Sequence, residues 1–89
     1  MEEQIRELLT KAGYIENKNG SAGFDITVSP DRETAGIVYE PALYTFPTDQ
    51  DRHAIAVAYQ RVLAPHFETV LPDQSAVLMV YSTRREERP

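Results

Sequence analysis

The two histidines are the side chains best suited to acid–base chemistry or metal binding, because imidazole titrates near neutral pH. His53 follows Asp49 by four residues, so in a helix both side chains lie on one face and can share a metal ion. A stable site needs three or four ligands, and no further pair of residues has ligand spacing. His66 follows Pro65 at the start of an expected strand, where packing is the simpler role. We therefore predict no metal and no cofactor, and keep His53 and His66 as the candidates for a small enzyme's site.

The other residue types that carry catalysis do not form a recognisable constellation. The chain has no cysteine, which excludes thiolate zinc sites, iron–sulfur clusters and cysteine nucleophiles. No serine lies in a Gly-x-Ser-x-Gly nucleophile pattern, and the glycine-rich residues 19–23 lack the Lys-Ser/Thr of a phosphate loop. The carboxylates are numerous but dispersed along the chain. We therefore expect a protein that is not an enzyme.

The charge balance indicates which partners the chain disfavours. Its 89 residues carry a formal net charge of −5, and residues 83–89 hold more arginine than glutamate, so the acidic excess lies in residues 1–82. An acidic domain repels phosphate backbones, which argues against nucleic acid as a partner. No apolar run approaches the ~18 residues of a membrane span, and the acidic start of the chain differs from the basic start of a signal peptide. We expect a cytoplasmic protein that does not contact a membrane.

Two amphipathic segments are the helices that must position these side chains. Apolar residues recur at helical spacing in residues 2–12 and again in residues 49–63. Gly13 stands where a glycine commonly ends a helix, Thr48 is a good N-cap for the second helix, and Pro65 stops it.

Short runs with period-two alternation or with a high β-propensity predict strands between and after the helices. The expected strands are residues 14–16, 24–28, 36–40, 66–71 and 76–82. The order is then α-β-β-β-α-β-β, an α+β fold with two helices packed on one face of a mostly antiparallel sheet of four or five strands. Residues 76–82 are apolar at successive positions, which is typical of a central strand buried on both sides. Residues 83–89 contain no apolar side chain, so we expect one domain at 1–82 followed by a charged, disordered tail.

The apolar positions of these elements give the expected core. Its members share a place on the inward face of a predicted helix or strand. They are Ile5, Leu8, Leu9, Phe24, Ile26, Val28, Ile55, Tyr59, Val62, Val77, Met79 and Tyr81.

A second apolar group has no obvious place in so thin a core. Tyr39, Leu43, Tyr44 and Phe46 surround a segment bounded by prolines, where we expect the strand to end or to lie at a sheet edge. Aromatic residues on an edge element are typical interface anchors, and an edge strand also offers unpaired backbone groups. We therefore take Tyr39, Leu43, Tyr44 and Phe46 as the candidate interface, with intramolecular cover by the second helix and the last hairpin as the alternative.

The predicted element order resembles that of type III secretion chaperones, which are dimers that bind extended segments of partner proteins. The resemblance lies in the order of helices and strands and assigns no role to any residue. The sequence therefore favours a small, acidic, non-catalytic protein-interaction module, adaptor or chaperone-like, that forms a homodimer and binds a protein segment. The alternatives are an acidic inhibitor or mimic that acts on a nucleic-acid-binding protein, and a small enzyme with a site near His53 or His66.

Overall fold

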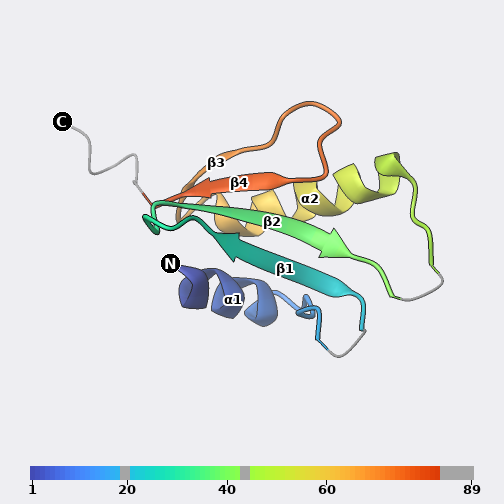
Figure 1. Ribbon diagram of the computed structural model, residues 1–89, viewed down its shortest axis with the longest axis horizontal. Helices are drawn as coiled ribbons and strands as arrows, with labels where there is room; N and C mark the ends of the chain where they lie inside the picture. Colours follow the sequence, from blue (N-terminus) through green and yellow to red (C-terminus); the bar gives the residue numbers. More distant parts are fainter. Residues whose placement is uncertain (19–20, 43–44, 83–89) are drawn as a thin grey trace.

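A computed structural model describes residues 1–18, 21–42 and 45–82 of the chain (Figure 1). Its elements, in chain order, are α1 (Glu2–Lys11), β1 (Gly23–Val28), β2 (Thr34–Glu40), α2 (Asp49–Leu63), β3 (Glu68–Val70) and β4 (Leu78–Tyr81). The expected tail at 83–89 lies outside the described residues.

The four strands form one antiparallel sheet in the order β1-β2-β4-β3, which confirms the α+β class. β4 lies in the interior of the sheet, as expected for residues 76–82. The strand expected at residues 14–16 is reduced to an isolated bridge between Glu16 and Phe24, so the order is α-β-β-α-β-β. This order lacks the third strand on which the resemblance to secretion chaperones was based, and the resemblance carries no further argument.

The connection from α1 to β1 is fixed by backbone geometry at two glycines. Gly13 has φ 100, and the backbone N–H groups of Gly13 and Tyr14 donate to carbonyls of the last helical turn. This left-handed residue ends α1 as its sequence position predicts. At Gly23 a side chain would collide with the backbone carbonyl of Ile15, so only glycine lets residues 15–17 pass this close to β1.

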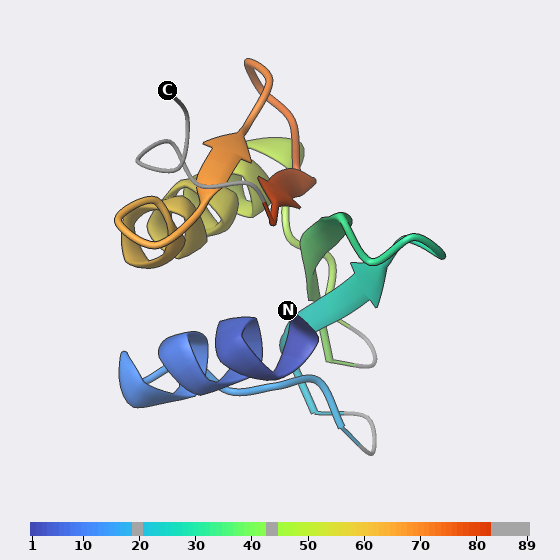
Figure 2. The same ribbon diagram turned by 90° about the vertical axis from the view of Figure 1, so that its left-hand side faces the viewer.

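Both helices lie on the same side of the sheet, and none of the described residues forms a helix on the other side (Figure 2). α1 contacts β1, whereas α2 contacts β2 and β4, so together they span the sheet. α2 begins with the expected cap: the hydroxyl of Thr48 accepts from the N–H of Asp51, and the Asp51 carboxylate accepts from the N–H of Thr48.

The core fills the space between the helices and this one face of the sheet. Its members are buried apolar side chains from all layers, namely Ile5, Leu9, Phe24, Ala35, Ile37, Tyr59, Leu63, Phe67, Leu78 and Val80. Leu8, Ile26, Val28, Ile55 and Val62 pack against this cluster and are partly buried. The expected core is therefore placed correctly on both helices and on β1.

The core residues expected on β4 and just before it, Val77, Met79 and Tyr81, are not the residues that the structure buries. Leu78 and Val80 are fully buried against the helices, whereas Val77 is 41% exposed and Met79 and Tyr81 are partly exposed. Successive side chains of a strand point to opposite faces, and only one face of this sheet carries helices. The expectation of burial on both sides therefore fails for β4, because nothing in the described part of the chain covers the second face.

Candidate interaction surface on the uncovered face of the sheet

The side of the sheet without helices is called the open face below, and the strand register defines its residues. Met79 pairs with Gly36 of β2 on one side and with Val70 of β3 on the other. Asp25 of β1 pairs with Val38 of β2. Directly paired residues point to the same face of a sheet, so these side chains share the face opposite the core.

An apolar stripe crosses the open face; we define it as Val38, Val70, Val77, Met79 and Tyr81. Val70 is 45% exposed and Val77 is 41% exposed, whereas the other three are partly exposed. A methyl group on Gly36 would lie 3.7 Å from Cγ1 of Val77 and 4.0 Å from Sδ of Met79. These two side chains therefore flank the bare backbone of Gly36, and the apolar surface is continuous from β2 to β3.

The charged side chains on the open-face positions of the described strands are all acidic. Asp25 and Glu40 are diagonal neighbours on β1 and β2, and Glu68 stands at the opposite end of the face on β3. Asp25 and Glu40 are exposed, and the ion pairs found in the described part of the chain involve neither. The apolar stripe thus has carboxylates toward both ends and no lysine, arginine or histidine.

On the helix side, in contrast, two carboxylates form ion pairs with one arginine. The guanidinium of Arg6 donates to Glu16 at 2.9 Å and to Glu2 at 2.6 Å. The hydrogen bond from Arg6 holds the pKa of Glu16 below its usual range, and the same bond raises the pKa of Arg6. These contacts fasten residues 15–17 to α1 and stabilise the edge of the covered face.

The structure places the expected interface residues in different environments. Tyr39 lies on the covered face, opposite Phe24 in the register, and packs against the core. Phe46 is 89% exposed in the loop that follows β2. Leu43 and Tyr44 lie outside the described residues. β2 is an interior strand between β1 and β4, and the edge strands of the sheet are β1 and β3, so the expectation that Tyr39 lies on an edge strand is wrong.

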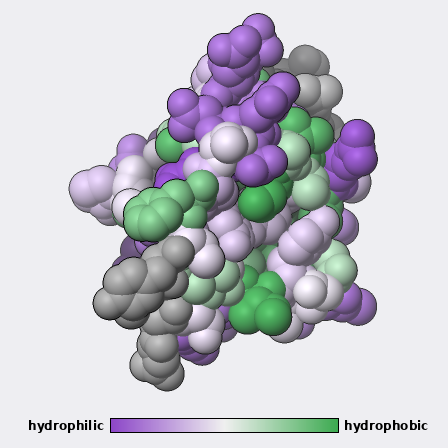
Figure 3. All heavy atoms as spheres, turned by 90° about the vertical axis from the view of Figure 1, so that its right-hand side faces the viewer, coloured by the Kyte–Doolittle hydropathy of each residue, from purple (hydrophilic) through white to green (hydrophobic). Residues whose placement is uncertain are grey.

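The end of the molecule where β2 stops shows mixed polarity (Figure 3). Hydrophobic residues lie there in small groups separated by hydrophilic ones. Phe46 is therefore an isolated exposed aromatic side chain among the described residues of its loop, because Thr45 and Thr48 nearby are polar and exposed.

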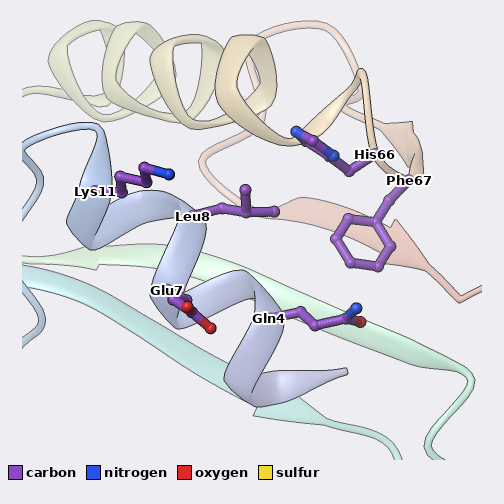
Figure 4. A pocket seen from close by; sticks show the side chains of 6 residues that line it. All are labelled: Gln4, Glu7, Leu8, Lys11, His66 and Phe67. Carbon is purple, nitrogen blue, oxygen red and sulfur yellow. The ribbon is translucent and has the colours of Figure 1, made fainter.

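His66 lines a recess between α1 and the turn after α2, with a volume of about 240 Å³ (Figure 4). The side chains of Lys11 and His66 extend toward one another with Leu8 between them. Glu7 and Gln4 also line the recess. No hydrogen bond or ion pair joins these polar groups in the structure, so the recess brings candidate acid–base residues near one another without the contacts of a catalytic pair.

The side chain of His53 makes a hydrogen bond that links two segments of the fold. Its Nδ1 lies 2.7 Å from the carbonyl oxygen of Ser75, which joins α2 to the loop before β4. A carbonyl only accepts, so Nδ1 carries the proton in this contact. Within the described residues no group of three His, Asp or Glu side chains is placed to hold a metal ion.

Comparisons with known proteins give no relative from which a role could be taken. No protein family, curated protein or solved structure matches this chain. Neither helix in the described part of the chain has the length and apolar content that crossing a bilayer requires.

The sequence contained a signal for the open face that the interpretation above missed. Val77, Met79 and Tyr81 alternate with the buried Leu78 and Val80, so an apolar set occupies each face of this strand. Two apolar faces predict a covering layer on each side, yet both helices of the described residues pack on one side. Counting the helices against the apolar faces would have indicated an uncovered one.

Proposed function

We propose that the protein is a non-catalytic interaction module that binds another protein through the open face. The observation that carries the proposal is the continuous apolar stripe across β2, β4 and β3 on the side of the sheet without helices. In a strand with one solvated face, inward apolar residues normally alternate with outward polar residues. A contiguous apolar surface that stays exposed marks an interaction site.

The open face suits a protein partner better than a small molecule. Small ligands bind in concave sites that bury most of their surface. Four of the best-formed recesses on the described part of the chain are lined by residues of α1, of the turns and of the start of α2, and by Val28 of β1. None of these four includes a residue of the apolar stripe.

The proposal is tested by selecting binders from a displayed library of random 16-residue peptides on the full chain. Each selected peptide is then measured against the double variant Val77→Asn/Met79→Gln, which removes apolar contact without adding charge. We expect the dissociation constant to rise at least about tenfold, because each apolar side chain that is buried contributes on the order of 1 kcal/mol or more.

Two matched variants identify the surface. Ile15→Asn replaces an apolar side chain that is 70% exposed at another place, and Phe46→Asn does so in the loop after β2. Neither should change the dissociation constant more than about twofold. Peptides that lose affinity only with Phe46→Asn would move the site to the loop, and a selection that yields no peptide sensitive to Val77→Asn/Met79→Gln would overturn the proposal.

A further inference from the structure

The charge of the open face, taken together with its apolar stripe, defines the chemistry of its partner. We infer that the partner is a cationic segment of a different protein, in which apolar side chains alternate with or are flanked by lysine or arginine. This inference rests on the proposed function, because it assumes that the open face is the binding surface.

The first argument is the contrast between the two sides of the molecule. On the helix side Glu2 and Glu16 are neutralised by Arg6. On the open face Asp25 and Glu40 stand as diagonal neighbours, and neither takes part in an ion pair with another described residue. Two neighbouring carboxylates repel each other, and a lysine or arginine of a partner placed between them removes that repulsion.

The second argument excludes the closest competitor, a second copy of the chain. In an isologous dimer both protomers contribute the same surface patch to the interface. Two open faces would place the carboxylates of Asp25 and Glu40 from each copy in one interface, and no lysine or arginine stands on the described strand positions of that face. The apolar stripe favours such a dimer but the charges oppose it, whereas a cationic partner satisfies both.

The position of Gly36 agrees with an extended segment as the occupant. Gly36 lies between Thr27 of β1 and Met79 of β4 and carries no side chain, so the backbone of β2 is bare at this point. A methyl group there would make only ordinary contacts with Val77 and Met79. An apolar side chain of the partner can therefore occupy the space above Gly36 while its basic neighbours reach Asp25 and Glu40.

The experiment uses the peptides selected on the full chain and compares two charge-neutralising double variants. Asp25→Asn/Glu40→Gln removes the open-face carboxylates, and Glu3→Gln/Glu7→Gln removes the same charge from exposed positions of α1. We expect the selected peptides to carry net positive charge. In 50 mM salt their dissociation constants should rise about five- to tenfold with the first variant and less than twofold with the second. The effect of the first variant should shrink in 300 mM salt.

Each of the other outcomes contradicts the cationic partner, and each shows whether the open face still stands as the binding surface. Peptides that are sensitive to Val77→Asn/Met79→Gln but insensitive to Asp25→Asn/Glu40→Gln overturn the cationic partner and leave the proposed function standing. Equal effects of the two charge variants indicate attraction to net charge alone and also overturn the inference. A wild-type dimer in sedimentation velocity that Val77→Asn/Met79→Gln dissociates identifies a second copy as the occupant, which contradicts the inference but not the open face as the interface.

Discussion

On β4 both faces of the sheet carry apolar residues, and the two faces differ in what lies against them. On β4 the covered face presents Leu78 and Val80, and the open face presents Met79 and Tyr81. Leu78 and Val80 are fully buried, whereas Met79 and Tyr81 are partly exposed. Apolar character therefore does not identify the core of this protein, because the number of covering layers decides which set is buried.

The largest expected effect comes from truncating the covered face. Leu78→Ala should lower the free energy of unfolding by about 3 kcal/mol, because the side chain is fully buried and its removal leaves a cavity. Met79→Ala, one residue along on the open face, should lower it by less than about 1 kcal/mol. Urea unfolding of both variants gives the comparison, and equal losses would mean that the open face is covered within the monomer.

The next effect concerns Tyr59, which is buried in the covered layer and packs edge-on against Tyr14 and Phe24 with ring centroids 5.2 and 6.2 Å apart. Burial raises the pKa of Tyr59 to about 12, from an ordinary value near 10. The unfolded chain therefore loses this proton first as the pH rises, so the stability is complete below pH 10 and falls above it.

Between pH 10 and pH 11 the loss should be about 1 kcal/mol, measured by urea unfolding. Tyr59→Phe should remove this step, while Tyr81→Phe on the open face should leave it in place. A step that persists in Tyr59→Phe would show that another group causes it.

The sequence could predict the covered layer because local rules determine it. The helical spacing of Ile5 and Leu9, the left-handed Gly13 and the cap at Thr48 each depend on residues close in the chain. The sheet order and the choice of the face on which the helices pack depend on contacts between distant segments, so the alternation of β4 alone could not tell which face was buried.

The candidate site was less predictable for the same reason. Tyr39 looks like an interface residue when β2 is placed at an edge, but β4 pairs with β2 and the register turns Tyr39 toward the core. Val70 and Met79 belong to separate segments of the sequence and become neighbours only through the β3–β4 pairing. The interaction surface is thus a product of strand order, which one sequence does not specify.

The ion pair on the covered side should have a smaller effect. Glu16→Gln removes the bond to Arg6 and should lower the free energy of unfolding by about 0.5–1 kcal/mol at pH 7, since the pair is partly exposed. The lowered pKa of Glu16 means that its contribution is present above the ordinary carboxyl range and is lost as the pH falls through the lowered value.

Urea unfolding of wild type and Glu16→Gln at pH 7 and pH 2 measures this effect, and the difference should be smaller at the lower pH. Glu3→Gln, which removes an exposed carboxylate of α1 outside the ion pairs found here, is the matched control and should change stability by less than about 0.3 kcal/mol. A difference that grows toward pH 2 would contradict the stabilising role of the pair.

The smallest effect on stability is expected on the open face itself. Gly36→Ala should be neutral or stabilising by a few tenths of a kcal/mol, because the added methyl group meets only ordinary contacts and alanine restricts the unfolded chain. The same substitution should weaken a bound peptide, since it fills the space above the strand. A large loss of stability in Gly36→Ala would mean that this face is packed more closely than the structure has it.

Methyl NMR during titration with a selected peptide tests the central claim most directly. Methyl resonances of Val38, Val70, Val77 and Met79 report on the open face, and those of Ile5, Leu9 and Leu63 report on the covered layer. The account predicts that the open-face methyl resonances shift with the peptide concentration while the covered ones stay within line width. Shifts confined to the helices or to the recess beside His66 would contradict it.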